Sequence, residues 1–178
     1  MPELPRVLSS ETVYRGRLFN VELDRLAMDG GVIAERETLR HPGAVCMIPV
    51  LQDGRLAFVT QYRHPTGRRL LELPAGTLEK GEQPAAAAVR ELQEEIGYRP
   101  THCEALGGFF VAPGYTSEYI HLFACTDLEP GRLPGDEDED IEVEMLTVEA
   151  ALSAIESGDI CDAKSVIGVL RWSRRINR

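Results

Sequence analysis

One segment constrains the fold of this chain more than any other: GTLEKGEQPAAAAVRELQEEIGY, residues 76–98. Residues 83–97 have Pro84 near their start, a run of four alanines, and Gly97 where a C-cap is expected. Together these features predict one short helix. Apolar runs typical of strands precede and follow the segment. The chain must therefore accommodate a glutamate-rich helix next to a sheet.

The glutamates of this helix share one face. Glu91 and Glu95 are one helical turn apart and Glu94 borders the same face, so three carboxylates project together. Like charges at this spacing repel each other, and a divalent cation compensates them far better than water does. Carboxylate oxygens suit Mg²⁺ or Mn²⁺. We therefore expect a divalent metal site here, with Arg90 orienting or partly neutralising one glutamate.

The net charge narrows the possible partners. The 178 residues include 19 Lys and Arg against 29 Asp and Glu, which gives a net charge of −10. Nucleic acid is not an expected partner, because the neutralisation of phosphates by a basic surface supplies most of that affinity. An anionic substrate would need local cations, either arginines or a metal held by carboxylates.

The length of the chain fits one domain. The cellular compartment is predicted from two kinds of segment that the sequence does not show, a membrane helix and a secretory signal. No stretch approaches the ~20 apolar residues of a membrane helix, so no membrane partner is expected. The N-terminal residues have no apolar core of the kind found in secretory signals. We expect a cytoplasmic protein with four widely spaced, reduced cysteines, at Cys46, Cys103, Cys125 and Cys161.

Turn signals divide the first third of the chain into strand pairs. Residues 17–28 and 32–41 flank Asp29-Gly30-Gly31, which predicts a hairpin. Residues 44–52 and 55–63 flank Asp53-Gly54 and predict a second hairpin with a stronger strand pattern. Further strands are expected at 105–112, 118–128 and 141–148, and further helices at 148–158 and 162–176.

Strands outnumber helices in this pattern and do not alternate strictly with them. We therefore predict an α+β fold in which helices cover both faces of a mixed sheet. A doubly wound nucleotide-binding fold would need a GxGxxG or Walker loop after a strand, and the sequence contains neither.

The glutamates belong to a longer pattern, Gx₅Ex₇REUxEExGU, where U is a bulky apolar residue. This pattern resembles the Nudix box. Every defining position of that box is filled, by Gly76, Glu82, Arg90, Glu91, Leu92, Glu94, Glu95, Gly97 and Tyr98.

The resemblance implies an α/β/α sandwich that hydrolyses a nucleoside diphosphate linked to another group, with Mg²⁺ or Mn²⁺. By position, Glu91 and Glu95 would be the principal metal ligands and Glu94 an additional one. Glu82 would support the cluster, and the carbonyl of Ala75 would complete the coordination. Such a metal neutralises the phosphates and activates the attacking water.

Features outside the box are similar to the ADP-ribose pyrophosphatase subfamily. Pro113 lies sixteen residues beyond Gly97, at the position of that subfamily's marker proline, within FFVAPGYTSEYIHLF. The resemblance implies substrate contacts from Pro113 and from Glu118 of the same segment. Arg63, in TQYRHP, matches an arginine that meets the substrate phosphates.

The segment ERETLRHPGAV resembles the N-terminal strands of the same subfamily. Arg36 and Glu37 would contact the adenosine, and the two residues would be offered to a neighbouring subunit. We therefore expect a homodimer with exchanged N-terminal strands. Residues 1–43 would form the strand segment for dimerisation, and residues 44–178 the Nudix catalytic domain.

The acidic run GDEDEDIEV matches a loop that supplies a general base in this subfamily. Glu137 is the candidate base and Glu139 a candidate metal ligand, although neighbouring acids in the run are alternatives. Glu94 is the next candidate for the base.

The resemblance favours hydrolysis of ADP-ribose to AMP and ribose 5-phosphate. A nucleotide-sugar hydrolase of the GDP-mannose type is the alternative within the same chemistry. Enzymes that hydrolyse dNTPs are usually shorter and lack the N-terminal hairpin. A non-catalytic ligand-binding domain of this kind typically loses box carboxylates, and this chain keeps them all.

Overall fold

The computed structural model describes residues 4–135 and 140–177. The chain divides into two compact units. The first unit contains Met1–Gly43 and Phe110–Tyr119, and the second contains Ala44–Phe109 and Ile120–Arg178.

The first unit is built on a three-stranded antiparallel sheet, ordered β1 (Arg6–Arg15), β2 (Asn20–Ala27) and β3 (Ile33–Arg40). The predicted hairpin at 17–41 is confirmed, because β2 and β3 pair from Asn20↔Arg40 to Ala27↔Ile33. Gly30 and Gly31 of its turn have φ of 78° and 80°, the left-handed conformation that glycine adopts without steric cost. The strand β1 was not predicted.

Residues 110–119 join β3 within this unit. Leu39 N donates to the carbonyl of Tyr115 at 2.8 Å, and Ser117 N donates to the carbonyl of Leu39 at 3.0 Å. A side chain reinforces the contact, because the hydroxyl of Ser117 accepts a hydrogen bond from His41 N at 3.0 Å. These bonds fix the loop that contains Pro113 to the last residues of β3.

The described residues of the second unit form two sheets and three helices. One sheet has the order β7 (Ala75–Thr77), β4 (Ala44–Pro49), β9 (Tyr119–Pro130) and β8 (Tyr98–Phe110). The other has the order β10 (Glu142–Leu146), β5 (Leu56–Arg63) and β6 (Arg68–Glu72). The first sheet is mixed, as predicted, because β4 pairs parallel with β9 and antiparallel with β7.

The strand β4 lies at the centre of the second unit, and all six of its residues are buried. Successive side chains of a strand point to opposite faces. Cys46 and Ile48 pack in one apolar cluster with residues of α2 (Val148–Ser157) and α3 (Ala163–Ile176). Val45 and Met47 pack in a second cluster with α1 (Pro84–Glu95).

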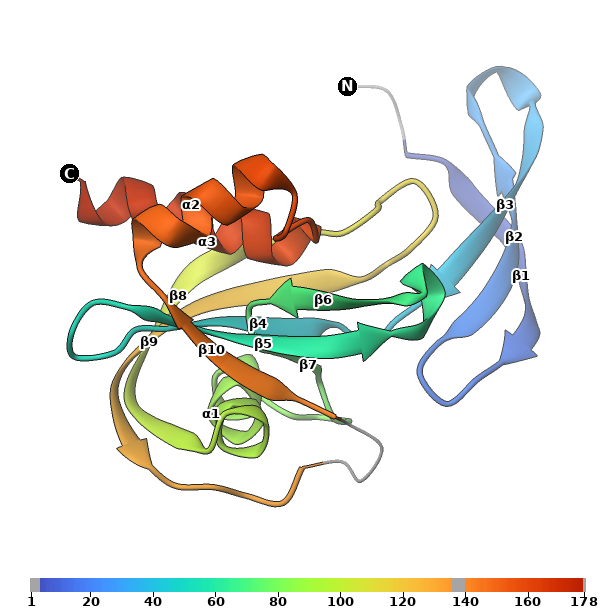
Figure 1. Ribbon diagram of the computed structural model, residues 1–178. Coiled ribbons are helices and arrows are strands. Elements are labelled where there is room, and N and C mark those ends of the chain that lie inside the picture. Colours follow the sequence, from blue (N-terminus) through green and yellow to red (C-terminus); the bar gives the residue numbers. More distant parts are fainter. Residues whose placement is uncertain (1–3, 136–139, 178) are drawn as a thin grey trace. The chain divides into compact units, whose positions relative to one another are not determined.

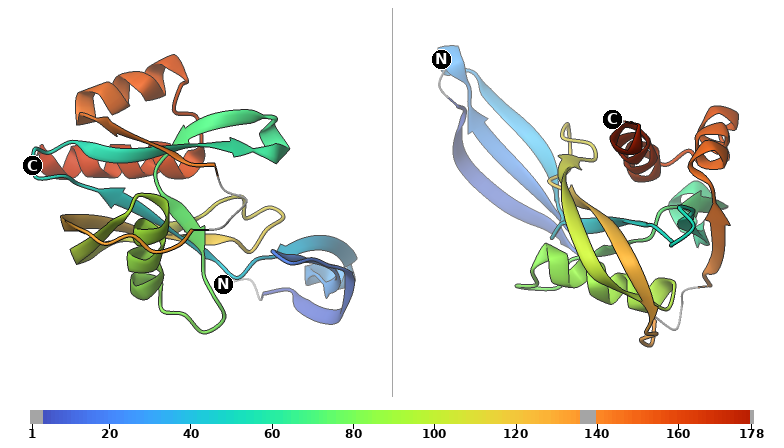
Figure 2. Two further views of the ribbon diagram at one scale, coloured as in Figure 1. Left: turned by 60° about the horizontal axis from the view of Figure 1, so that its bottom comes forward. Right: turned by 90° about the vertical axis from the view of Figure 1, so that its left-hand side faces the viewer.

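The two clusters make the unit an α/β/α sandwich, which confirms the expected fold class. In Figure 1, α2 and α3 lie on one face of the strands and α1 lies on the other. Figure 2 shows the same layers from two further sides. None of the helices among the described residues is long and apolar enough to cross a bilayer.

The second predicted hairpin is wrong. Both of its strands form and the Asp53-Gly54 turn is present, with Leu51 N donating to the carbonyl of Arg55 at 2.8 Å. Beyond the single bridge Val50↔Leu56, however, β4 and β5 belong to different sheets. The reason is that each strand already has a partner on both edges. The short strands β6 and β7 were not predicted.

The later elements agree with the sequence. The helices α1, α2 and α3 fall within the predicted ranges, and Thr147 and Asp162 cap α2 and α3 by accepting backbone N–H groups. The strands β8, β9 and β10 are present where strands were expected, although β8 begins earlier, at Tyr98.

Candidate functional site

The helix α1 presents two different faces. Ala87, Ala88 and Leu92 are fully buried against the second apolar cluster, which fixes the helix to the strands. Glu91 and Glu94 lie outside that apolar face, with side chains 12% and 24% exposed. The predicted carboxylates therefore lie half-buried at the edge of a rigid packing surface, except for Glu95, which is buried.

Gly76 of β7 lies directly against the carboxylate of Glu91. A Cβ atom added to Gly76 would overlap the carboxylate carbon and both of its oxygens. No side chain other than hydrogen fits there. The first glycine of the pattern is thus required for space next to Glu91.

Arg90 connects the carboxylates of the helix and of the preceding loop. Its Nε and Nη2 each donate to Glu82 at 2.9 Å, which is a bidentate pair. Its Nη1 lies 2.8 Å from Glu91 Oε1 and donates to Glu94 Oε2 at 2.9 Å. A longer bond, of 3.3 Å, reaches the carbonyl of Thr77. The structure therefore brings three of the predicted carboxylates, those of Glu82, Glu91 and Glu94, together around the guanidinium of Arg90.

These contacts fix the charge states of Arg90 and Glu82, the pair that joins α1 to the loop before it. Hydrogen bonds from Arg90 are the main reason that the pKa of Glu82 is below its ordinary value. The hydrogen bond to Glu82 is likewise the main reason that the pKa of Arg90 is raised. The pair is ionised at neutral pH, and the guanidinium offsets the repulsion among the neighbouring glutamates.

The donor set of this cluster fits a divalent cation. Among the residues that the structure describes, no three Asp, Glu, His or Cys side chains already converge on one point. The carboxylates of Glu91 and Glu94 instead face a single nitrogen of Arg90. Carboxylate oxygens such as these are nevertheless ligands that Mg²⁺ and Mn²⁺ prefer.

Arg63 lies at the end of β5, as predicted, in a second charged cluster. Its Nε and Nη2 donate to Glu72 of β6 at 3.0 and 2.7 Å. Lys164 of α3 donates to the same carboxylate, and also to Asp162 at 2.9 Å. Sequence reasoning missed Glu72 and Lys164, because no local pattern marks two charges that meet across the fold.

The remaining predicted substrate contacts lie in the first unit. Arg36 and Glu37 are exposed on β3, where Arg36 Nη1 donates to the carbonyl of Glu35 at 2.8 Å. Pro113 is exposed and Glu118 is partly buried in the segment that joins β3. Glu137 and Glu139, the candidate base and its neighbour, lie outside the described residues.

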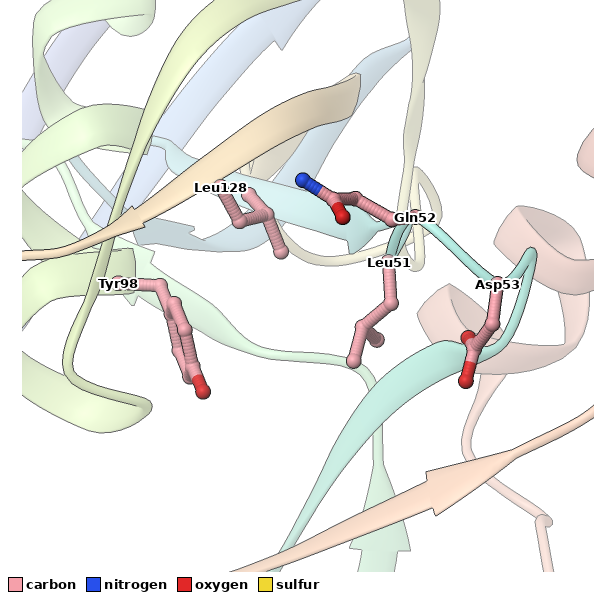
Figure 3. A pocket seen from close by; sticks show the side chains of 5 residues that line it. All are labelled: Leu51, Gln52, Asp53, Tyr98 and Leu128. Atoms are coloured by element: carbon pink, nitrogen blue, oxygen red, sulfur yellow. The ribbon is translucent and has the colours of Figure 1, made fainter.

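A pocket of about 340 Å³ lies elsewhere in the second unit (Figure 3). Leu51, Leu128 and Tyr98 form its apolar part, and Gln52 and Asp53 come from the turn between β4 and β5. None of the metal ligands expected on α1 lines it. The carboxylate cluster and this pocket are therefore separate features.

Comparisons with known proteins agree with this geometry. A family model for the NUDIX domain matches residues 40–166. The chain is 34% identical over 166 residues to "ADP-ribose pyrophosphatase" of Bacillus subtilis (strain 168), covering 92% of this chain and 90% of that one. It is 37% identical over 166 residues to "Methanol dehydrogenase activator" of Bacillus methanolicus, with coverages of 92% and 90%.

A solved crystal structure of an ADP compounds hydrolase superimposes with a TM-score of 0.89 at 28% sequence identity. The match covers 99% of this chain and 96% of the other. The family match includes the sandwich core and the whole carboxylate helix, so sequence and structure lead to the same conclusion: this chain belongs to the NUDIX family.

Proposed function

We propose that this chain hydrolyses the pyrophosphate of ADP-ribose to AMP and ribose 5-phosphate. The observation that carries the proposal is the gathering of Glu82, Glu91 and Glu94 around Arg90, beside Gly76. The similarity to an ADP-ribose pyrophosphatase over most of both chains supports ADP-ribose as the substrate.

A divalent cation is part of this proposal, as in NUDIX hydrolases generally, and Mg²⁺ or Mn²⁺ fits the donor set. Glu91 and Glu95 would hold it, with Glu94 and the carbonyl of Ala75 as further ligands. When bound, the cation would neutralise the pyrophosphate and activate the attacking water. Arg90 and Glu82 would keep the ligands in place.

The protein itself would bind the substrate and move the proton. Arg63 would meet the phosphates, and Arg36 and Glu37 would contact the adenosine, with Pro113 and Glu118 as further contacts. Glu137 would accept the proton of the water, and Glu139 would be a further ligand. Steady-state kinetics of Glu137→Gln and Glu139→Gln across a Mg²⁺ titration separates these two roles, because only loss of a ligand shifts the metal dependence.

The substrate is tested with a panel of ADP-ribose, GDP-mannose and dNTPs in Mg²⁺, with phosphatase-coupled detection of the products. We expect kcat/KM for ADP-ribose to exceed the others by at least ~10-fold. Faster hydrolysis of GDP-mannose would replace the proposal with a nucleotide-sugar hydrolase. Binding without hydrolysis of any compound would replace it with a ligand-binding domain.

A second candidate function is the activation of a methanol dehydrogenase, which the similarity to a protein of that name favours. The test adds the purified chain to a methanol dehydrogenase and measures the oxidation rate. Glu91→Gln is the matched comparison. Activation that survives this substitution would be independent of hydrolysis, and no activation would leave ADP-ribose hydrolysis as the only proposal.

We further propose a cytoplasmic homodimer in which the N-terminal strands are exchanged. The motivation is the apolar surface of the first unit, where Val7, Val13 and Tyr14 of β1 are each more than half exposed. A strand with such a surface is an expected site of association. Light scattering at micromolar concentration tests the proposal, and the mass of a single chain would contradict it.

A further inference from the structure

We propose that Glu72, anchored by Lys164, is a positioning residue that presents Arg63 to the substrate phosphates. This inference rests on the proposed hydrolysis of a nucleoside diphosphate, and it adds two residues to that site. Neither residue belongs to the NUDIX pattern of residues 76–98, and neither would touch the substrate.

The contact between Glu72 and Arg63 fixes the orientation of the guanidinium plane of Arg63 as well as its position. Nε of Arg63 lies 3.0 and 3.2 Å from the two carboxylate oxygens, and Nη2 lies 2.7 Å from Oε2. Two parallel N–H bonds to one carboxylate set the orientation of a guanidinium, which a single bond would leave free to rotate. β5 and β6 pair in this region, with Arg63↔Arg68 as the last pair, so both backbones are also fixed.

Burial makes this carboxylate a fixed partner. The side chain of Glu72 is only 2% exposed, so water cannot replace its hydrogen bonds. Burial acts to raise the pKa of Glu72, but the hydrogen bonds from Arg63 and the charge of Lys164 outweigh it and lower the pKa. Glu72 is therefore ionised at neutral pH and holds its two cations continuously.

Lys164 ties the pair to the sandwich. It donates to Glu72 and, at 2.9 Å, to Asp162, the N-cap of α3. The hydroxyl of Ser165, in the same helical turn, accepts a hydrogen bond from Leu73 N at 2.7 Å. The first turn of α3 thus holds the chain at Glu72 and at the next residue, Leu73, so the carboxylate is fixed independently of Arg63.

The arrangement suits recognition of a phosphate. More than a third of the Arg63 side chain remains exposed, at 36%, although one edge of its guanidinium is held. An arginine that is already ordered loses less conformational entropy when it meets an anion, so affinity rises without a new contact. Lys164 adds a second positive charge beside the single negative charge of Glu72. The three side chains together therefore keep a net positive charge, which attracts a phosphate.

A double-mutant cycle tests the inference. The four proteins are wild type, Arg63→Ala, Glu72→Gln and the double variant, assayed with the nucleoside diphosphate compound that wild type hydrolyses best. If Glu72 acts through Arg63, Glu72→Gln should raise KM about 10-fold in wild type and less than about 2-fold in the Arg63→Ala background. In both backgrounds kcat should stay within about 3-fold.

The controls separate positioning from folding. Asp53→Asn removes an exposed carboxylate whose Oδ2 lies 2.8 Å from Arg55 Nε, and KM should not change. Glu72→Asp keeps the charge but shortens the side chain, so KM should lie between wild type and Glu72→Gln. If Glu72→Gln does not fold, the same cycle is run with Glu72→Asp.

Two results would overturn the inference. One is an unchanged KM for the Glu72 variants, and the other is an equal rise in KM with and without Arg63. Both differ from a failure of the proposed function, in which the wild-type protein hydrolyses none of the nucleoside diphosphate compounds.

Discussion

The backbone of Gly76 lies so close to the carboxylate of Glu91 that a Cβ atom added to Gly76 would overlap all three carboxylate atoms. Gly76→Ala must therefore displace Glu91 or distort β7. We expect kcat to fall by at least ~10-fold, because displacing one group in a site by about 1 Å already has large effects. Gly168→Ala is the control, since its Cβ would lie 2.5 Å from Leu73 Cδ1 in the core. That variant should lower Tm with little specific loss of kcat.

Glu91 and Glu95 should be the residues whose loss removes metal-dependent activity. Glu91→Gln or Glu95→Gln should lower kcat by at least ~10²-fold with the circular dichroism spectrum unchanged. Binding of Mn²⁺, followed by electron paramagnetic resonance, should weaken in parallel. Glu156→Gln, which changes an exposed glutamate of α2, should affect neither measurement. Full activity of either site variant in EDTA would contradict the assignment.

Arg90 should set the acid limit of stability through Glu82. The pKa of Glu82 is lowered chiefly by Arg90, so its contribution to stability is present above its unfolded pKa and is lost as pH falls through the folded pKa. In Arg90→Gln the pKa of Glu82 should return towards its ordinary value. We therefore expect Arg90→Gln to lower Tm at neutral pH and to remove the acid-side fall that Glu82 causes, so the difference in Tm from wild type should shrink as pH falls through the pKa of Glu82. Arg25→Gln, at an exposed ion pair of 3.8 Å with Glu35, should leave the profile unchanged.

Lys164 should contribute strongly to stability, because its side chain is only 11% exposed and touches two carboxylates. Lys164→Met leaves Glu72 with Arg63 alone and Asp162 without its lysine. Breaking a buried ion pair in this way costs about 3–5 kcal/mol of the free energy of unfolding. Arg55→Met, at an exposed pair, should cost less than about 1 kcal/mol. Urea unfolding of the three proteins measures both values.

The pH dependence of that cost has a defined sign. Folding lowers the pKa of Glu72. The contribution of Glu72 to the free energy of unfolding is therefore lost as pH falls through the folded pKa, below the ordinary value of about 4.3. Burial acts to lower the pKa of Lys164, but the charges of Asp162 and Glu72 outweigh it and raise the pKa. The contribution of Lys164 to the free energy of unfolding is therefore lost only as pH rises beyond about 10.4. The difference between wild type and Lys164→Met should be constant near neutrality and shrink in acid.

Local signals in the sequence were sufficient for several elements. Pro84 and Gly97 bracket α1, Thr147 and Asp162 cap the next two helices, and the Asp29-Gly30-Gly31 turn closes the first hairpin. Each of these depends on residues within one turn or one loop. The spacing of Arg90, Glu91 and Glu94 likewise required only helical geometry.

Nonlocal pairing was not predictable in the same way. Asp53-Gly54 makes a turn, but whether β4 and β5 then pair depends on which strands occupy their edges, and β9 and β10 lie far along the chain. The contact between Glu72 and Lys164 was not predictable for the same reason. The two residues are far apart in sequence and meet only when α3 packs against the strands. The hydrophobic periodicity of a sequence indicates helices and strands, but it carries no information about which distant residues come into contact.

Because β4 pairs with β9, from Ala44↔Ile120 to Pro49↔Cys125, the surface beneath α1 is incomplete until residue 125 has left the ribosome. Contacts between distant segments form slowly. A helix of 12 residues is marginal by itself. During synthesis this helix therefore emerges before Phe123 and Cys125, which complete the apolar cluster around Leu92 and Ile96. The surface on which α1 and its carboxylates rest is therefore completed late in translation, when β9 pairs with β4.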